Sequence, residues 1–252
     1  MESSCIAEKA TMATIFLLYG VASYALFLAT FLYAIGFVGN FLVPKSMDLP
    51  PGEFTLAALA VNLAVLGVFA VQHSVMARRG FKAWWTRIVP PAIERSTYVL
   101  ATNLALMLIF WQWRPLGGVL WDVSGSGLAW LLWALCATGW GVVLISTFLI
   151  DHFELSGLLQ VWCHFRGKPL PQKGFRTPSF YRHVRHPIYF GFLLAFWATP
   201  VMTVTHLLFA LATTGYIVIG TLLEERDLLA HFEDRYREYR ARVPMLIPAL
   251  RR

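Results

Sequence analysis

Two histidines and two arginines stand directly before an apolar run, in the segment YRHVRHPIYFG at residues 181–191. Pro187 suits the first turn of a helix, because its missing N–H group would have no helical partner there. The free N–H groups and the positive end of the helix dipole would then face His183, Arg185 and His186, which favours an anionic ligand. The segment therefore predicts an anion-binding site.

A pair of carboxylates, Glu224 and Glu225, stands where the next apolar run gives way to a polar helix. Since both ends of a helical hairpin lie at one membrane face, we expect this pair to neighbour His183 and His186. Carboxylates at the boundary of a bilayer are costly unless they have partners, so a functional site is the default hypothesis. The alternative is an ordinary basic flank that forms salt bridges with two glutamates.

The elements that must position these residues are transmembrane helices. The chain has 252 residues, of which 58% are hydrophobic and only 14% are charged. A soluble domain has about 25% charged residues, and a crossing helix needs roughly 20 apolar ones. Apolar runs of this kind cover residues 12–43, 54–76, 98–113, 128–150 and 188–223.

The last apolar run, 188–223, is too long for one untilted crossing. Pro200 and the segment 203–206 divide it into two arms, which predicts a hairpin. We expect an all-α integral membrane protein with five to six transmembrane helices. Residues 1–150 would form a four-helix transmembrane region, and residues 151–252 would carry the chemistry.

The net charge of +7 raises the question of nucleic acid binding. The Lys and Arg residues, however, are concentrated in short loops between apolar runs, as in cytoplasmic membrane-flanking loops, so no nucleic acid partner is expected. The same rule predicts that the N-terminus, the polar stretch 151–187 and the basic tail face the cytosol. The three cysteines are scattered without metal-ligand spacing, so no metal site is predicted.

The tail predicts an amphipathic helix at the membrane surface. Leu228, Phe232, Tyr236 and Tyr239 recur at helical spacing and form one apolar stripe, while the other faces are charged. Such a helix could cover the site, with Tyr236 and Tyr239 as walls.

Three sequence patterns in this region resemble the isoprenylcysteine carboxyl methyltransferase superfamily, which includes phospholipid methyltransferases and nurim-like proteins. They are Arg-His-Pro-x-Tyr-x-Gly at 185–191, Glu-Glu-x-x-Leu at 224–228 and Phe-x-x-x-Tyr-x-x-Tyr at 232–239. The resemblance covers about residues 181–248. Glu233 departs from it, since that family often has Gly at this position.

The apolar N-terminal spans and the segment DHFELSGLLQVW at 151–162 are similar to membrane-bound methanethiol S-methyltransferases. This resemblance implies a small thiol substrate, an S-adenosyl-L-methionine cofactor at the cytosolic face and, in a bacterium, a place in the inner membrane. It says nothing of the oligomeric state.

The resemblance also implies roles for individual residues. Arg185 and His186 would suit the carboxylate of the cofactor, and Glu224 or Glu225 its ammonium or ribose hydroxyl groups. Aromatic rings would pack on adenine or face the sulfonium. The complete set of expected cofactor-binding residues is Tyr181, His183, Arg185, His186, Pro187, Tyr189, Gly191, Glu224, Glu225 and Tyr236.

A thiolate is the reactive form of a thiol, so methyl transfer to a thiol needs a base, and imidazole works near neutral pH. His152 and His183 are the candidates, with Asp151 or Glu154 orienting the imidazole. The alternative for His152 is a histidine at the end of a helix at the membrane interface. The other histidines are interpreted differently: His73 as a hydrogen-bonding residue packed between helices or, as the alternative, a residue that lines the site, and three as loop or interface residues, namely His164, His206 and His231.

Other functions stay open at this point. The acceptor could be an isoprenylcysteine or a phospholipid. Membrane sterol reductases that use NADPH have a similar C-terminal pattern, and four basic residues could hold the extra phosphate, namely Arg166, Lys168, Lys173 and Arg176. A non-enzymatic nurim-like membrane protein is a further alternative.

Overall fold

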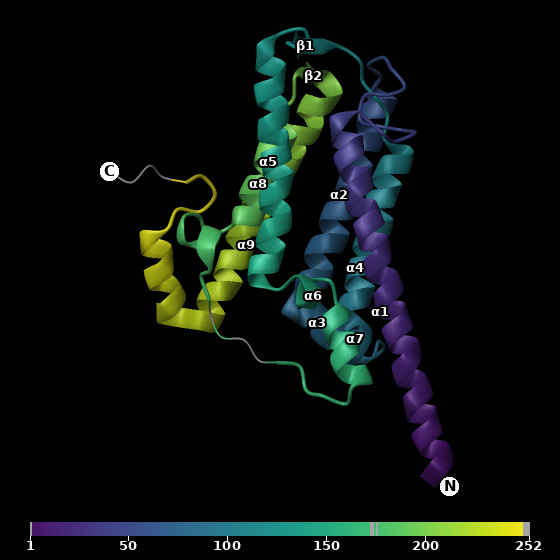
Figure 1. Cartoon of the computed structure of the whole chain (residues 1–252). Helices are drawn as coiled ribbons and strands as arrows, with labels where there is room; N and C mark the ends of the chain where they lie inside the picture. The colour runs from purple at the N-terminus through teal and green to yellow at the C-terminus, as the bar shows by residue number, and fades with distance from the viewer. Residues whose placement is uncertain (1, 172–173, 175, 249–252) are drawn as a thin grey trace. The chain divides into compact units, whose positions relative to one another are not determined.

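Most of the described residues are helical, and five helices among them are long and apolar enough to span a membrane (Figure 1). The structure is a computed structural model that describes residues 2–171, 174 and 176–248. Lys173, which we considered for a phosphate, lies outside the described residues. The five long helices are α1 (Glu2–Gly39), α2 (Leu56–Ala77), α4 (Pro91–Gln112), α5 (Gly127–Ile150) and α9 (Val204–Arg242). The prediction of an all-α, multi-pass membrane protein is confirmed.

Packing divides the described residues into two compact units, each assembled from separate stretches of chain. The first unit lies within Met1–Phe37, Ala60–Trp113 and Asp151–Gln172, and the second within Val38–Leu59, Arg114–Ile150 and Lys173–Arg252. The sequence assigns a transmembrane region to residues 1–150 and the chemistry to residues 151–252, and this assignment stays a prediction.

In the first unit, the polar stretch after α5 forms two short helices, α6 (His152–Leu155) and α7 (Leu158–Phe165). We did not predict them. Gly157 joins them with a φ of +88°, and its missing Cβ lets Ser96 of α4 approach closely. Arg95 donates a hydrogen bond to the carbonyl of Leu155 at 2.8 Å. These contacts explain how a short polar stretch is held against a membrane helix.

The basic loop after α2 also contains a short helix, α3 (Arg79–Trp85), which the sequence did not predict. Next to it, His73 of α2 lies 3.0 Å from the hydroxyl group of Tyr98 and 3.2 Å from that of Thr102, both on α4. The interpretation of His73 as a hydrogen-bonding residue between helices is therefore confirmed.

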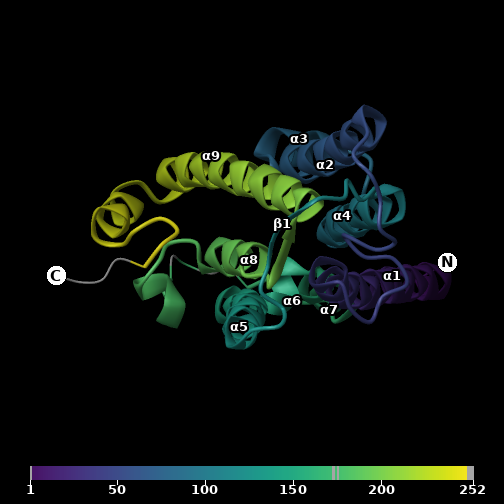
Figure 2. The same cartoon turned by 90° about the horizontal axis from the view of Figure 1, so that it is seen from above.

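In the second unit, α8 (Pro187–Trp197) lies between α5 and α9 (Figure 2). Its contact with α5 depends on two glycines. A Cβ on Gly139 would lie 2.7 Å from the carbonyl oxygen of Gly191, and one on Gly191 would lie 2.7 Å from that of Gly139. Small residues at such crossings let two helix backbones approach closely, as is common in membranes.

The predicted hairpin is present, but its two arms differ. At 1.5 Å per residue, the 11 residues of α8 span roughly 16 Å. Residues 198–203 then connect the two arms, with a bend at Pro200. Within them, β2 (Val201–Thr203) pairs antiparallel with β1 (Val119–Asp122), a small sheet that we did not predict. The returning arm, residues 204–224, is wholly helical and spans roughly 32 Å. The open ends of the two arms lie together, since Nε of Arg185, just before α8, is 2.6 Å from the carboxylate of Glu225 on α9.

The tail is helical, as predicted: α9 continues past Glu224 and Glu225, and a break in the helical backbone at Glu233 separates its first part from a second helix that ends at Arg242. One expectation about the last arm needs correction. His206 is no loop or interface residue: it is 1% exposed, and its Nε2 lies 2.7 Å from the carbonyl oxygen of Phe196. That carbonyl belongs to the last turn of α8, where the helix leaves it without a helical partner.

Candidate functional site

The site begins where the chain enters α8. Pro187 occupies the first helical turn, as predicted, and His186 is the residue at the N-cap. The preceding 3-10 helix η1 (Ser179–Arg182) buries the ring of Tyr181. Arg185 and His186 are also buried, with exposed fractions of 9% and 6%. Two basic side chains are thus withdrawn from water, which is costly unless each has a partner.

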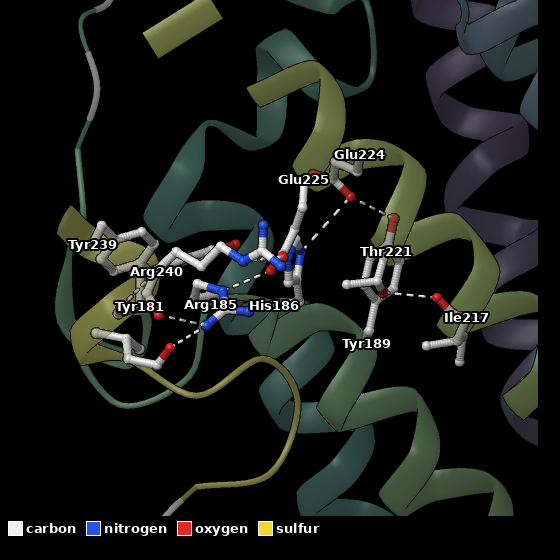
Figure 3. Close-up of polar contacts among 11 residues, drawn as sticks. Tyr181, Arg185, His186, Tyr189, Ile217, Thr221, Glu224, Glu225, Tyr239 and Arg240 are labelled. Carbon is white, nitrogen blue, oxygen red and sulfur yellow. Dashed lines mark hydrogen bonds and ion pairs between the residues drawn. The ribbon is translucent and has the colours of Figure 1, made fainter. Parts of the chain in front are cut away.

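Glu225 of α9 is the main partner of both side chains (Figure 3). Arg185 donates from Nε to a carboxylate oxygen of Glu225 at 2.6 Å, and Nε2 of His186 lies 3.2 Å from the same oxygen. Glu225 itself is 2% exposed. The predicted meeting of the basic segment with the carboxylate pair is therefore present, in the form of a buried charge cluster.

Glu224 forms the outer part of the same cluster. The hydroxyl group of Tyr189 donates to its carboxylate at 3.0 Å, and Nδ1 of His186 lies 3.7 Å from it. The rings of His186 and Tyr189 stack, with centroids 5.6 Å apart. Because the side chain of Glu224 is 45% exposed, this carboxylate is available to a ligand, whereas that of Glu225 is enclosed by its partners.

The C-terminal tail closes over the start of α8. The backbone N–H groups of Arg185 and His186 donate to the carbonyl oxygens of Pro244 and Met245, at 2.9 and 3.2 Å. Arg185 also donates from Nη1 to the carbonyl oxygens of Arg240 and Val243. The tail is therefore fixed to the basic segment at several points, mostly through its backbone.

Aromatic side chains of the tail complete this closure. Tyr239 donates from its hydroxyl group to the carbonyl of Tyr181 at 2.5 Å, and Tyr236 is 1% exposed. The pKa of Tyr181 is raised, first by burial and then by the nearby carboxylate of Glu224, so its hydroxyl group keeps its proton. Tyr236, which the sequence predicted as a wall of a site, and Tyr181, which it predicted to bind the cofactor, are thus both buried, and their roles in a site stay predictions.

The remaining members of the predicted set differ in their surroundings. His183 is exposed, and its side chain forms no hydrogen bond or ion pair with the described residues. Gly191 is buried against α5, so the space left by its missing Cβ is filled by a neighbouring helix. Pro187 contributes the start of α8. Helix packing thus explains the missing side chain at Gly191, whereas His183 is accessible to solvent.

Arg240 is a basic residue of the cluster that the sequence did not single out. Its Nε lies 3.4 Å from the second carboxylate oxygen of Glu225, and its side chain is 49% exposed. The tail contains many charged residues at exposed positions, so only the fold of the tail distinguishes Arg240 from its neighbours. No sequence signal could have found it.

The candidate base His152 belongs to the first unit, whereas the charge cluster belongs to the second. His152 is 4% exposed, and its Nε2 lies 2.9 Å from the hydroxyl group of Tyr24 on α1. Burial lowers the pKa of His152, so the imidazole is neutral at pH 7. Tyr24 was missed because a single tyrosine inside an apolar span resembles a packing residue.

The two acidic residues near His152 are joined by a hydrogen bond at the start of α6. Asp151 is the N-cap of α6, and its carboxylate accepts a hydrogen bond from the backbone N–H of Glu154 at 3.1 Å. This contact satisfies one of the N–H groups that a helix leaves free at its start. Among the residues described by the structure, no group of three or more His, Cys, Asp or Glu side chains could hold a metal ion.

Comparison with known proteins gives consistent matches over most of the chain. A family model described as "Protein of unknown function (DUF1295)" matches residues 116–243. A methanethiol S-methyltransferase from Mycobacterium tuberculosis is 57% identical over 232 residues, which cover 92% of this chain and 95% of the relative. One from Crocosphaera subtropica is 52% identical over 93% of this chain and 92% of its own length.

A more distant relative is Nurim from Mus musculus, which is 36% identical over 69% of both chains. No solved structure matches the chain.

Proposed function

Because the chain belongs to the family of methanethiol S-methyltransferases, we propose that it transfers a methyl group from S-adenosylmethionine to methanethiol within the membrane, giving dimethyl sulfide. The observation that carries this proposal is the likeness to the bacterial enzymes, which extends over nine-tenths of both chains. The buried charge cluster in the last third of the chain supports it, because costly polar groups at a membrane boundary are typical of functional sites.

The residues around Glu224 suit an S-adenosyl donor. Glu224 offers a half-exposed carboxylate for an ammonium or a ribose hydroxyl group, and the stacked rings of His186 and Tyr189 lie beside it. Aromatic faces also attract positive charge. When bound, S-adenosylmethionine supplies a methyl group on a positively charged sulfur atom. The chain's own contribution is to orient the donor and the thiol in line, since alignment accounts for much of such catalysis.

The thiol must lose its proton, because the thiolate is the nucleophile. As the bond between its sulfur and the methyl carbon forms, the bond from that carbon to the donor sulfur breaks. We propose His152 as the group that accepts the proton, since it is neutral at pH 7 and has a fixed partner in Tyr24. His183 is the second candidate, and Asp151 and Glu154 are proposed to orient the imidazole.

We further propose that the charge cluster faces the cytosol and that, in a bacterium, the chain lies in the inner membrane. The argument is the distribution of basic residues, which follow α2 and α5 and fill the tail, whereas the segments after α1 and α4 have few. Residues 151–252 would then carry the donor site. A labelling experiment that placed the tail on the outer side would contradict this orientation.

The test uses the full chain in detergent or in lipid nanodiscs, with methanethiol and S-adenosylmethionine. We expect dimethyl sulfide in the headspace by gas chromatography, and S-adenosylhomocysteine as the second product. We also expect S-adenosylhomocysteine, but not NADPH, to raise the melting temperature. A folded protein that forms no dimethyl sulfide and that NADPH stabilises would instead support the reductase alternative.

Substitutions in the cluster make the test specific. Glu225→Ala should reduce the dimethyl sulfide signal nearly to background, but this change also removes a buried charge. Glu224→Gln is therefore the better variant, because Glu224 is half exposed and its replacement keeps the shape. Glu238→Gln, at an exposed ion pair of the tail, is the matched control and should leave the rate unchanged.

A further inference from the structure

Two arginines contact the carboxylate of Glu225, and they differ in their access to solvent. Arg185 meets one oxygen at 2.6 Å with a side chain that is 8% exposed. Arg240 meets the other oxygen at 3.4 Å with a side chain that is 49% exposed. Figure 3 shows the two guanidinium groups beside the same carboxylate. The two residues therefore have different capacities to bind a ligand.

The guanidinium of Arg185 is committed to the protein. It donates to Glu225, to the carbonyl of Arg240 and to the carbonyl of Val243. A guanidinium has five N–H donors, so these contacts use a large part of its capacity. A ligand that displaced them would take the closest donor from the buried carboxylate of Glu225 and would leave two carbonyls of the tail without this donor, which is costly. Arg185 is thus a poor group to receive the carboxylate of a cofactor.

Arg240 can change partners at little cost. Its side chain donates no hydrogen bond to the described residues, and its contact with Glu225 is a longer ion pair. If Arg240 turned to a ligand, Glu225 would keep its contacts with Arg185 and with His186. An arginine with an open edge is suited to a carboxylate, which it can bind through two parallel hydrogen bonds.

We propose that Arg240 binds the carboxylate of the amino-acid part of S-adenosylmethionine, while Glu224 binds its ammonium group. Arg185 is a positioning residue, which holds Glu225 and the tail in place. The inference rests on the proposed function. It differs from the expectation that Arg185 and His186 bind that carboxylate, and the reason is the burial of both side chains.

The test compares two ligands by isothermal titration calorimetry on the full chain in detergent. One is S-adenosylhomocysteine, and the other is its analogue without the carboxylate, which keeps the ammonium. For Arg240→Ala we expect affinity for the first to fall by about 10- to 100-fold, the range that one contact between charged groups supplies. Affinity for the analogue should stay as in the unmodified protein. Arg240→Lys should recover part of the loss.

Three further variants separate the possible causes. Glu224→Gln should lower the affinity for both ligands, because both carry the ammonium. Arg185→Ala should lower the affinity for both ligands and also the melting temperature. Arg237→Ala, at an exposed ion pair one turn earlier in the tail, should change neither affinity.

Different failures have different meanings. If Arg240→Ala weakens the two ligands equally, or neither, the assignment of Arg240 is overturned and the proposed function is unaffected. If the unmodified protein binds neither ligand, the proposed donor is wrong, and the assignment of Arg240 is overturned with it.

Discussion

Arg185 and Glu225 are 40 positions apart in the sequence, yet the guanidinium of one lies 2.6 Å from the carboxylate of the other. Both side chains are buried, and the pair joins the start of α8 to α9 at the open end of the hairpin. Since Arg185 also holds two carbonyls of the tail, one side chain links three segments of the second unit.

Removing one partner of this pair should destabilise the protein strongly. Arg185→Ala leaves Glu225 as a buried carboxylate with too few donors, which typically costs about 3–5 kcal/mol of the free energy of unfolding. Chemical denaturation in detergent measures this loss. Arg237→Ala removes an exposed ion pair with Asp234 and should have little effect, because such pairs contribute little. Equal losses for the two variants would contradict the role of Arg185.

Glu233 interrupts α9 with a φ of +47° and a ψ of −119°. This backbone region is populated almost only by glycine, and a residue with a Cβ is strained there by about 1–3 kcal/mol. Glu233→Gly should therefore stabilise the protein. Asp234→Gly, at the next residue, where the backbone is helical again, should destabilise it by up to about 1 kcal/mol. Opposite shifts of the denaturation midpoint are expected, and shifts of the same sign would contradict strain at Glu233.

The sequence predicted that His186 lies close to Glu224 and Glu225, because this prediction depends only on the length of the apolar run between them. An apolar run that crosses the bilayer twice must return to the face where it began. The departure at Glu233 from the glycine of the related superfamily also had a structural meaning, since that position has a positive φ. The departure at Glu233 is local in the sequence, and the meeting of the two arms follows from the thickness of a membrane.

Features that depend on pairs of distant segments could not be predicted. Tyr24 and His152 are 128 positions apart, and nothing in either segment indicates the other. Arg240 is one of many charged residues in the tail, and only the fold places it beside Glu225. His206 resembled an interface residue because it follows a break in an apolar run, whereas its ring in fact contacts a carbonyl of α8.

The contact between α5 and α8 should depend on the absence of side chains at its centre. Gly139→Ala would place a Cβ 2.6 Å from the backbone nitrogen of Ala195, so the two helices would have to separate. We expect a loss of stability of about 1–3 kcal/mol, as for other overpacked cores. Thermal unfolding in detergent measures it. Gly141→Ala, on the same helix with open space around it, should be neutral or slightly stabilising. A loss at Gly141 as large as that at Gly139 would disprove this explanation.

The buried imidazole of His152 should make stability depend on pH. In the unfolded chain its pKa is near 6.5, and in the folded protein burial lowers it. The unfolded state therefore binds the proton first as the pH falls. The free energy of unfolding should decrease below about pH 6.5, and the decrease should continue down to the lowered pKa of the folded state.

The variant His152→Gln isolates this contribution, because the amide of glutamine can replace Nε2 in the contact with Tyr24 but does not titrate. Denaturation between about pH 7.5 and 5 should show a smaller decrease for this variant than for the unmodified protein. The other histidines contribute equally to both curves and cancel in the difference. Parallel curves for His152→Gln and the unmodified protein would show that His152 is not held neutral by burial.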